Sequence, residues 1–514
     1  MKCNNCGREL NNGSKFCPYC GVPVKKKYEK LWLILLVVAV FSILAGSVCF
    51  VASRIFGQFI NNTGIGISSS TGESGTDMVC VNGVICNSAG AVNNRFKGAK
   101  EYEFYTDPEG TVGMIFVDGE VNLIDSGLNM TCIDKNCVDA VMNYTGKYIY
   151  VATSNSSELG KGLCVYNVNE KDYKLIEACD IEDSRCLATS PDGNTALVSR
   201  EGAIFMMGAD GFSEKIYDGP GAFDALLVSN DRKVAYFVPT LREGLFCWKE
   251  GNVIQFYDEM FWGNIAANSD CKKILFYNAG VGLNYFDSDT MSESKVVLSD
   301  STFSALYKGK GFVFSDTDVN YFPGADSFEG MYITAGRTSF WLNADIDAVC
   351  KDEYWSEVCS GSEFKVYDIT EKSINSITYK DGETKTEEVY HNDNGVYDCA
   401  VSDDGRLLWI LLYDKIVTYK DGKVQGDAFK IPGDGFSVGC IKNDPLSDKA
   451  YCISDNGKVY MLDEKGNNTE IGTVKGAYGL YTDFSNGKEI VTVEDEDDNR
   501  IFIVHGKLIK KDDN

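Results

Sequence analysis

Histidine is almost missing from this sequence of 514 residues, which contains only His391 and His505. These two residues lie far apart along the chain, so no local motif joins a histidine to a serine, an aspartate or a cysteine. We expect each histidine to be a surface residue. Carboxylate pairs are so common in an acidic chain that they identify no catalytic pair without geometry. The sequence therefore predicts a protein that is not an enzyme.

Basic residues are also scarce beyond the first thirty positions. The chain holds 49 Lys and Arg against 75 Asp and Glu, a net charge of −26, and residues 1–30 carry +5, which leaves −31 for the rest. A domain this acidic lacks the clustered cations that nucleic acid or anionic lipid would need, so neither is expected as its partner. The acidic run 494–498 is predicted to be a solvated hairpin loop, since no EF-hand spacing favours calcium.

Helical periodicity is nearly lacking, with one long apolar run as the exception. Residues 31–52, LWLILLVVAVFSILAGSVCFVA, include no charged side chain. At about 1.5 Å per residue, this helix would span roughly 33 Å, enough to cross the hydrocarbon core of a bilayer. The alternative is a cleaved signal peptide, but its apolar region is normally about 7 to 15 residues long. We expect one uncleaved transmembrane helix.

The charges beside this run predict its orientation and the layout of the chain. Four lysines stand in the basic juxtamembrane segment 25–30, whereas Arg54 stands alone on the other side. The positive-inside rule places the N-terminus in the cytoplasm and everything after the helix outside it. Residues 53–77 are rich in Gly, Ser and Asn and are predicted to form a flexible linker. The remainder, residues 78–514, is then an extracytoplasmic domain of a single-pass cell-membrane protein.

The N-terminal segment carries four cysteines in the pattern C-x2-C-x10-C-x2-C, and each pair is followed by a glycine: Cys3, Cys6, Cys17 and Cys20. Four thiolates at about 2.3 Å close a tetrahedral zinc site that has no open position. Such a site is structural, and the metal supplies the folding energy of a segment too short to own a core. The alternatives are two disulfides or four idle thiols.

The sequence around these cysteines reads CNNCGREL and FCPYCG. They resemble the short bacterial zinc-ribbon domains, whose pattern is CxxCGxxL followed by FCxxCG. The resemblance covers about twenty residues of the chain. It implies a structural Zn²⁺ site, is compatible with a protein-contact module, and implies no reaction. We therefore expect residues 1–24 to form a cytoplasmic zinc ribbon.

The long C-terminal region repeats a strand, a turn and a strand. Aligned copies are CLATSPDGNTALVS, DALLVSNDRKVAYFV, IAANSDCKKILFY, DCAVSDDGRLLWIL and GLYTDFSNGKEIVTV. The equivalent turn positions are Gly110, Gly146, Gly193, Arg232, Cys271, Gly309, Gly405, Ser447 and Gly487. They lie 36 to 47 residues apart, except for one interval of 96. Each turn is followed by an alternating strand and a second hairpin, which gives four short strands in roughly 40 residues.

Four strands per repeat is the organisation of one propeller blade. The Ser-x-Asp-Gly turns resemble those of WD40-like repeats and related periplasmic propellers over residues 99–514, although the WD dipeptide is absent and no partner follows from the likeness. The fold prediction is all-β: a large β-propeller of about 8 to 10 four-stranded blades. A ring of seven or eight blades with extra hairpins, or two smaller rings, are the alternatives.

Two stretches receive separate expectations. VCVNGVIC, residues 79–86, could complete the last blade and close the ring. SFWLNADIDAVCKDEYWSEVCSG, residues 339–361, looks like an extended loop that projects from one face.

Fourteen cysteines lie between Cys80 and Cys452. An even number in an oxidising compartment suggests disulfides. The short spacings favour Cys80 with Cys86, Cys132 with Cys137 and Cys350 with Cys359, while Cys440 and Cys452 belong to one hairpin. The alternative is that several are buried thiols.

These features together predict a membrane-anchored receptor or scaffold. Its propeller would bind a protein or glycan partner of unknown identity, and its zinc ribbon would remain inside the cell. A carboxylate-based hydrolase or lyase on the propeller is one alternative. The other is a sensor of envelope state that acts across the membrane through the ribbon.

Overall fold

The part of the chain that can be described begins at residue 77. The computed structural model describes residues 77–509 except 100–101, 155–156, 158–159, 178–187, 201–202, 219–223, 240–242, 262–263, 279–280, 291–292, 299–302, 309–310, 316–322, 326–327, 336–337, 353–355, 360–364, 381–382, 403, 414, 431–440, 486–487 and 497–498. The predicted ribbon, juxtamembrane segment and membrane helix lie outside these residues, as does nearly all of the linker. Among the described residues, no helix is long and apolar enough to cross a membrane.

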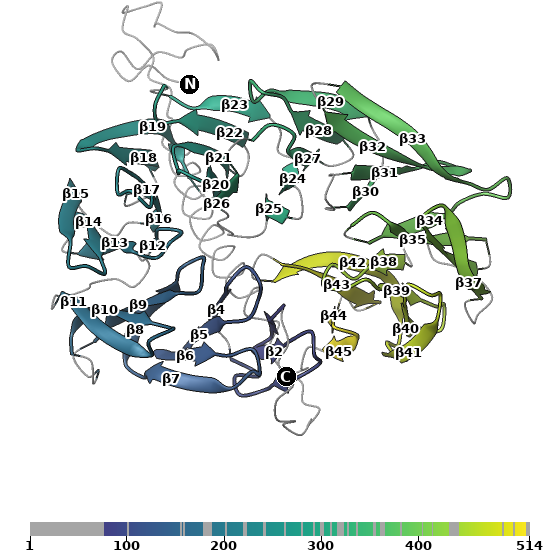
Figure 1. The fold of residues 1–514 in the computed structure, drawn as a ribbon, viewed down its shortest axis with the longest axis horizontal. Coiled ribbons are helices and arrows are strands. Elements are labelled where there is room, and N and C mark those ends of the chain that lie inside the picture. The colour runs from purple at the N-terminus through teal and green to yellow at the C-terminus, as the bar shows by residue number, and fades with distance from the viewer. Residues whose placement is uncertain are drawn as a thin grey trace, which may run out of the picture. The chain divides into compact units, whose positions relative to one another are not determined.

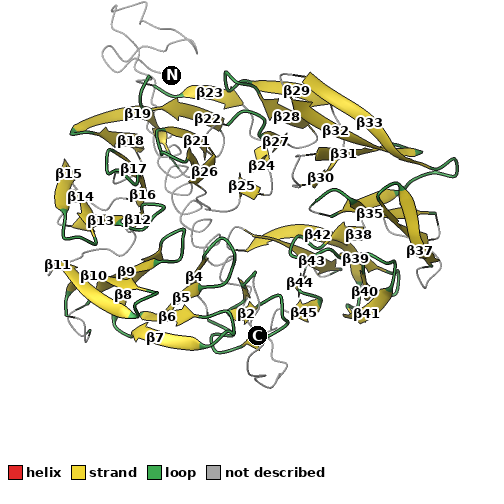
Figure 2. Cartoon of the chain, in the orientation of Figure 1, coloured by secondary structure: helices red, strands yellow, loops and turns green. Residues whose placement is uncertain are grey.

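The described residues form strands and loops and contain no helix (Figure 2). Their strands make eleven sheets, of which eight are four-stranded, two are five-stranded and one is three-stranded. The four-stranded sheets are antiparallel meanders of consecutive strands, labelled in Figure 1. The all-β prediction with repeated four-stranded units is therefore confirmed.

We number the sheets 1 to 11 in chain order. Sheet 1 holds β1 (Val79–Val81), β2 (Val84–Cys86) and β3 (Val92–Asn93). Sheet 2 holds β4 (Glu103–Thr106), β5 (Gly113–Val117), β6 (Glu120–Ile124) and β7 (Met130–Asp134), and sheet 3 holds β8 (Cys137–Met142), β9 (Tyr148–Thr153), β10 (Gly162–Asn167) and β11 (Asp172–Glu177). Sheet 4 holds β12 (Ala188–Thr189), β13 (Thr195–Arg200), β14 (Ala203–Gly208) and β15 (Ser213–Asp218), and sheet 5 holds β16 (Asp224–Val228), β17 (Val234–Val238), β18 (Glu243–Lys249) and β19 (Asn252–Met260).

Sheet 6 holds β20 (Asn264–Asn268), β21 (Lys273–Asn278), β22 (Gly282–Asp287), β23 (Lys295–Leu298) and β26 (Pro323–Ala325), and sheet 7 holds β24 (Phe303–Lys308), β25 (Gly311–Ser315), β27 (Tyr332–Ala335), β28 (Thr338–Leu342) and β29 (Ala348–Asp352). Sheet 8 holds β30 (Ser356–Cys359), β31 (Lys365–Ile369), β32 (Ser373–Lys380) and β33 (Glu383–His391), and sheet 9 holds β34 (Asp398–Val401), β35 (Leu407–Leu412), β36 (Lys415–Lys420) and β37 (Lys423–Phe429). Sheet 10 holds β38 (Ile441–Asn443), β39 (Ala450–Ile453), β40 (Lys458–Leu462) and β41 (Asn468–Thr473), and sheet 11 holds β42 (Ala477–Ser485), β43 (Lys488–Asp495), β44 (Arg500–Val504) and β45 (Lys507–Ile509).

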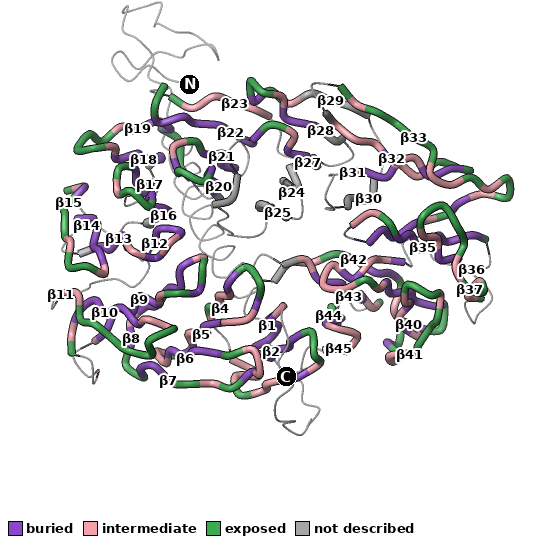
Figure 3. Tube along the Cα trace, viewed as in Figure 1, coloured by how far each residue is buried: buried purple, intermediate pink, exposed green. Residues whose placement is uncertain are grey.

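Burial follows the position of a strand within its sheet (Figure 3). Central strands such as β22 and β35 are buried at every position, whereas outer strands such as β33 and β41 are largely exposed. A strand that is buried at successive positions is covered on both of its faces, because neighbouring side chains point to opposite sides. The core therefore lies between neighbouring sheets.

The turn that begins each repeat has a fixed set of hydrogen bonds. In sheet 4, the backbone N–H of Ser190 donates to the carbonyl of Thr195 at 2.8 Å, and the Ser190 hydroxyl accepts from the Thr195 N–H at 3.1 Å. Gly193 has a φ of +74°, and the residues aligned with it, Arg232 and Cys271, each have a φ of +60°. Two non-glycine residues thus adopt the left-handed conformation that the repeat requires, which confirms this part of the alignment.

A tyrosine on the second strand of several sheets reaches the turn of the next sheet. Its hydroxyl donates to a backbone carbonyl there: Tyr150 to Gly193 at 2.8 Å, Tyr236 to Lys272 at 3.1 Å and Tyr367 to Gly405 at 2.7 Å. A buried hydroxyl needs such a partner, since its burial without one costs free energy. The repeat therefore joins neighbouring sheets by a periodic hydrogen bond as well as by apolar packing.

The first and last sheets also contact each other. A ring nitrogen of His505, in sheet 11, lies 3.1 Å from the carbonyl oxygen of Asp77, and Lys507 donates to the carbonyl of Gly90. His505 is partly exposed, and it also joins the two ends of the described chain. Residues 79–86 were expected to complete the last sheet, but they belong to sheet 1, which contacts sheet 11 without pairing in it.

The interval of 96 residues contains an insertion. Position 309, which we aligned with the other turns, lies between β24 and β25, and these strands do not have the pairing of a repeat. Instead β25 lies at one edge of sheet 7 and β26 pairs in parallel with β20 of sheet 6. Gly309 itself lies outside the described residues, but β24 pairs with β27 as well as with β25, so the strands around this position are not those of an ordinary repeat. Gly330, with a φ of +75°, comes just before β27.

The stretch 339–361 is not an extended loop. Its described residues lie in β28, β29 and β30, which form parts of sheets 7 and 8, and in the turn between β28 and β29; residues 353–355 and 360–361 lie outside the described part. Trp341 is buried, and its ring stacks on Tyr379 with 5.5 Å between centroids and 12° between planes. Trp341, which lies in the expected loop, therefore packs between two sheets.

The cysteines whose side chains are described are thiols, among them Cys80, Cys86, Cys132 and Cys137. The expected pairing of Cys80 with Cys86 is wrong, since their cross-strand partners are Ile85 and Val79, and consecutive pairs point to opposite faces of the sheet. Cys132 and Cys137 stand in different sheets. The side chains of Cys350 and Cys359, and residue Cys440, lie outside the described part of the chain.

Candidate functional site

The predicted zinc ligands Cys3, Cys6, Cys17 and Cys20 lie outside the described residues. Within the described residues, no group of three or more His, Cys, Asp or Glu side chains is placed to hold a metal ion. The candidate sites in the described part are therefore aromatic and polar clusters.

Two pairs of tyrosines stand out because large apolar side chains are otherwise mostly buried. Tyr397 and Tyr413 are 56% and 71% exposed, and Tyr478 and Tyr481 are 39% and 40% exposed. Both pairs have ring centroids 6.1 Å apart. Exposed neighbouring aromatic rings are a feature of binding surfaces, since each ring offers a rigid apolar face beside a polar hydroxyl.

Tyr397 and Tyr413 flank β34 and β35, the first two strands of sheet 9. Tyr397 precedes β34, Tyr413 follows β35, and the N–H of Tyr397 donates to the carbonyl of Leu411 at 2.9 Å. The antiparallel pairing of β34 with β35 therefore brings both rings to the same end of the sheet. This pair is tilted, with 56° between the planes.

Tyr478 and Tyr481 are brought together by a bulge at the start of β42. A regular strand would point residues i and i+3 to opposite faces. The pairing of β42 with β43 shifts between Ala477 and Gly479, which leaves Tyr478 as the extra residue. A bulge of this kind re-aims a side chain, and the two rings meet at 71°.

A polar network fixes the second pair. The Tyr478 hydroxyl donates to Glu494 Oε2 at 2.9 Å, and Arg500 Nε donates to Glu494 Oε1 at 2.9 Å. Arg500 Nη1 also donates to Asp483 Oδ2 at 3.1 Å. Glu494 belongs to the acidic run that was predicted to be a solvated hairpin loop. A hairpin does join β43 to β44 there, but Glu494 itself lies in β43 and is only partly exposed.

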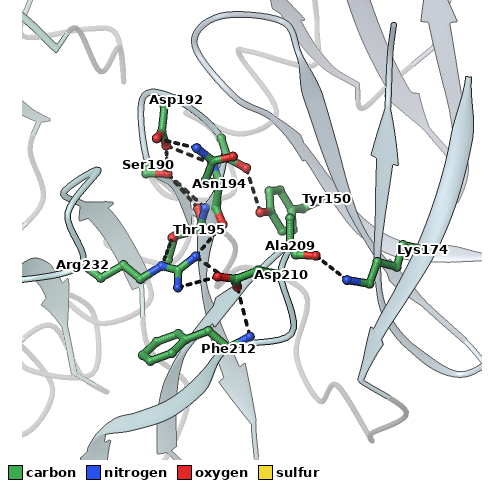
Figure 4. A network of polar contacts seen from close by, with 11 residues as sticks. Tyr150, Lys174, Ser190, Asp192, Asn194, Thr195, Ala209, Asp210, Phe212 and Arg232 are labelled. Carbon is green, nitrogen blue, oxygen red and sulfur yellow. Dashed lines mark hydrogen bonds and ion pairs between the residues drawn. The ribbon is translucent and has the colours of Figure 1, made fainter. Parts of the chain in front are cut away.

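Arg232 is the centre of a second polar network, between sheets 4 and 5 (Figure 4). Its Nε donates to Thr195 Oγ1 at 2.8 Å, and Nη1 and Nη2 donate to the two carboxylate oxygens of Asp210 at 3.0 and 3.1 Å. The guanidinium lies 4.7 Å from the ring centroid of Phe212. The hydrogen bond from Arg232 holds the pKa of Asp210 below its usual value.

A depression of about 420 Å³ lies beside this network and is lined by Asn194, Ala209, Asp210, Asn230, Asp231 and Arg232. All three guanidinium nitrogens of Arg232 donate within the protein. Asn230 likewise accepts from the N–H of Asp192 at 3.0 Å. Because these groups already bond one another, we interpret the network as a tie between two sheets.

A buried carboxyl group lies where sheets 2 and 3 meet. Burial raises the pKa of Asp139 to about 8, the nearby charge of Glu103 adds to the rise, and the N–H of Ala140 opposes it. The Tyr105 hydroxyl donates to Glu103 Oε2 at 2.9 Å. Burial raises the pKa of Glu103 as well. A carboxyl group with a raised pKa near a second carboxyl group is an arrangement that general acid and base catalysis uses.

His391 lies next to Ser373, Glu388 and Asp393. Its Nδ1 is 2.9 Å from the Ser373 hydroxyl, and its Nε2 is 3.3 Å from Asp393. Ser373 and His391 are cross-strand partners on β32 and β33, and the Ser373 hydroxyl also reaches Glu388 at 2.8 Å. Ser373 is buried and its hydroxyl bridges Glu388 and the His391 ring, so the contact is that of a paired sheet position.

Sequence reasoning missed both tyrosine pairs. The bulge at Tyr478 has no marker beyond the adjacent Gly479, and an alternating pattern predicts that the two rings diverge. Tyr397 and Tyr413 stand on either side of two strands that can be recognised in the sequence. Only the antiparallel pairing of these strands brings the two residues together.

Residues 2–24 match the family model of the zinc-ribbon domain, which confirms the zinc ribbon predicted from the cysteine pattern. No curated protein matches the chain. A crystal structure of a eukaryotic initiation factor is 11% identical, with a TM-score of 0.39 over 70% of this chain and 96% of that chain. The extracellular domain of a proposed hybrid two-component system from B. thetaiotaomicron is also 11% identical, with a TM-score of 0.27 over 85% of this chain and 75% of that chain. Neither likeness is close enough to carry an argument.

Proposed function

We propose that the chain is a membrane-anchored binding protein, a receptor or scaffold. Its zinc ribbon would be cytoplasmic and structural, residues 31–52 would span the membrane, and the sheet domain would bind a protein or glycan partner outside. The observation that carries the proposal is the pair of exposed tyrosine clusters on a domain built of repeated sheets. A rigid repeat scaffold with few polar anchors and exposed rings is suited to binding.

For the sheet domain we propose one closed propeller rather than two rings. The tyrosine bonds and the Arg232 network join neighbouring sheets in chain order, and the contact of His505 with Asp77 joins the last sheet to the first. Closure would protect the inner sheet edges from pairing with other chains. Eleven sheets exceed the usual four to eight blades, and the small sheet 1 would be the eleventh unit.

For the ribbon we propose that the four predicted cysteines hold one Zn²⁺. The family match at residues 2–24 supports this ligand set. We expect a double variant, Cys17→Ser with Cys20→Ser, to lose the zinc and unfold the ribbon while the sheet domain keeps its melting temperature. Zinc content by atomic emission is the measurement, and a full equivalent of zinc in the variant would contradict the ligand set.

The topology can be tested with a membrane-impermeant thiol reagent on intact and on permeabilised cells. Cys132 is the least buried of the described thiols and is the natural reporter of the sheet domain. We expect a Cys132 label in intact cells and ribbon labelling only after permeabilisation and chelation. A Cys132 label that requires permeabilisation would place the acidic domain inside and overturn the orientation.

One observation favours a second candidate, a carboxylate-based hydrolase or lyase. Burial raises the pKa of Asp139 to about 8, and it also raises the pKa of Glu103, whose charge acts on Asp139. Turnover by the purified chain in a substrate screen, lost in Asp139→Asn, would favour the enzyme. Binding without turnover would favour the receptor or scaffold.

A further inference from the structure

We propose that Tyr478 and Tyr481 form a binding site for neutral carbohydrate on sheet 11. This inference rests on the proposed binding function and names the class of ligand and the residues that would recognise it. The site consists of the two rings together with Glu494, Arg500 and Asp483.

The geometry of β42 builds a rigid aromatic corner. Gly479, which lies between the two tyrosines in the sequence, is buried. A Cβ at this position would lie 3.0 Å from Tyr481 Cε2 and 3.0 Å from the Tyr481 hydroxyl oxygen. The Tyr481 ring therefore lies back over Gly479, and the bulge turns Tyr478 toward it. The rings are held at 71° before any ligand arrives. Preorganised rings lose little conformational entropy on binding.

Polar groups flank the rings at fixed positions. Gly479 pairs with Glu494 and Glu494 pairs with Arg500, so these three residues lie side by side across β42, β43 and β44. Glu494 accepts from both Tyr478 and Arg500, and a carboxylate retains further lone pairs for ligand hydroxyls. Apolar faces beside fixed acceptors and donors match a sugar ring, which offers C–H groups on its faces and hydroxyls around its edge.

The charges favour a neutral ligand. Glu494 and Asp483 are both paired with Arg500, so a charged ligand would have to compete with bonds that already exist. The surrounding domain also repels anions, because the chain carries a net charge of −26. A hydroxylated neutral ligand can bind without breaking any of these pairs.

The test uses the full-length chain in detergent and isothermal titration calorimetry. The probes are neutral hexasaccharides of glucose, mannose, xylose and N-acetylglucosamine, with a sialylated and a sulfated oligosaccharide as charged probes. We expect at least one neutral probe to bind and both charged probes to fail.

Four variants locate the site. We expect Tyr481→Ala and Tyr478→Ala each to raise the Kd about tenfold or more, since each removes one ring. Tyr481→Phe should stay within about threefold of the unmodified chain, because the ring remains. The matched control is Tyr173→Ala, a tyrosine on sheet 3 that is 37% exposed, which should leave the Kd within about twofold. Should Tyr481→Ala fail to fold, Tyr481→Leu replaces it as a folded variant without the ring.

The inference is overturned if no neutral probe binds, if a charged probe binds more tightly, or if binding survives the loss of both rings. It is also overturned if Tyr173→Ala rather than Tyr481→Ala removes binding. Other results would contradict the proposed receptor function or its topology rather than the carbohydrate site. A protein partner crosslinked to the outer domain without carbohydrate binding would leave the receptor intact, whereas tyrosine-dependent carbohydrate binding by a domain facing the cytoplasm would refute the topology alone.

Discussion

Asp139 is a residue whose carboxyl group remains mostly protonated near neutral pH, because burial raises its pKa to about 8. An unfolded aspartate has a pKa of about 3.9, so the folded chain binds more protons than the unfolded chain between about pH 4 and pH 8. The contribution to stability is complete below the unfolded pKa and is lost as the pH rises through the folded value. The free energy of unfolding should therefore fall by up to about 1.4 kcal/mol per pH unit in this window.

Asp139→Asn should remove this part of the pH dependence, since the amide does not titrate. Urea unfolding of both proteins at intervals from pH 5 to pH 8.5 is the measurement. Parallel curves for the two proteins would show that Asp139 is not the titrating group.

Arg232 is a residue that joins two sheets through one side chain. Arg232→Ala should lower the free energy of unfolding by about 1 to 2 kcal/mol, because it removes a bidentate pair with Asp210 and the contact with Phe212. The control is Lys215→Ala, which removes the more exposed ion pair with Asp218 and should cost less than about 0.5 kcal/mol. Equal costs in urea unfolding would mean that the network does not tie the sheets.

Residue-scale features show where sequence reasoning stops. The cysteine pattern of the ribbon could be recognised because a metal site fixes its ligand spacing. The Tyr478 site could not, since a bulge in one strand is set by its pairing partner, and Glu494 and Arg500 reach it from two other strands.

The turn of the repeat is the element whose sequence was most informative. Gly193 adopts a φ of +74°, and a Cβ there would lie 2.5 Å from the Asn143 side chain of the preceding sheet. Gly193→Ala should therefore destabilise the protein by about 2 to 4 kcal/mol, through backbone strain and the clash together.

Gly211→Ala is the matched control for this turn. Its φ is +92°, and a Cβ would meet nothing within 4 Å, so only the backbone strain of about 1 to 3 kcal/mol remains. The difference between the two melting curves isolates the contact between sheets. A larger loss for Gly211→Ala would contradict the role of Gly193 as a contact position.

The repeat was predictable as an element because recognisable turn residues separate its strands. Ser or Asn at the first turn position, followed by a residue in the left-handed conformation, recurs even where Arg232 and Cys271 replace glycine. The insertion of β25 and β26 was not predictable, because only strand pairing reveals it: β25 lies at the edge of sheet 7 and β26 pairs with β20 of sheet 6. The stretch 339–361 misled for a related reason, since Trp341 is buried by sheet packing that the local sequence does not encode.

For the whole molecule, the contact between the first and last sheets is the main long-range feature. A double variant, His505→Ala with Lys507→Ala, should speed amide hydrogen exchange in β1 and β2 as well as in β44 and β45. The sheets in between should keep their protection, because their neighbours are unchanged. Faster exchange confined to β44 and β45 would show that the ends are not coupled.

The joint between His505 and Asp77 spans 428 positions, whereas most other sheets meet a neighbour about 40 residues away. During synthesis at about 5 to 20 residues per second, roughly 20 to 90 s separate the appearance of these two residues. Sheets in the middle of the chain can fold against the preceding one as they emerge. Sheet 1 can pack against sheet 2 early, because Cys80 and Ile85 share a core with Phe104 and Ile115. Only its contact with sheet 11 must wait for the final residues, so this contact forms last and is the one most open to interference from other chains.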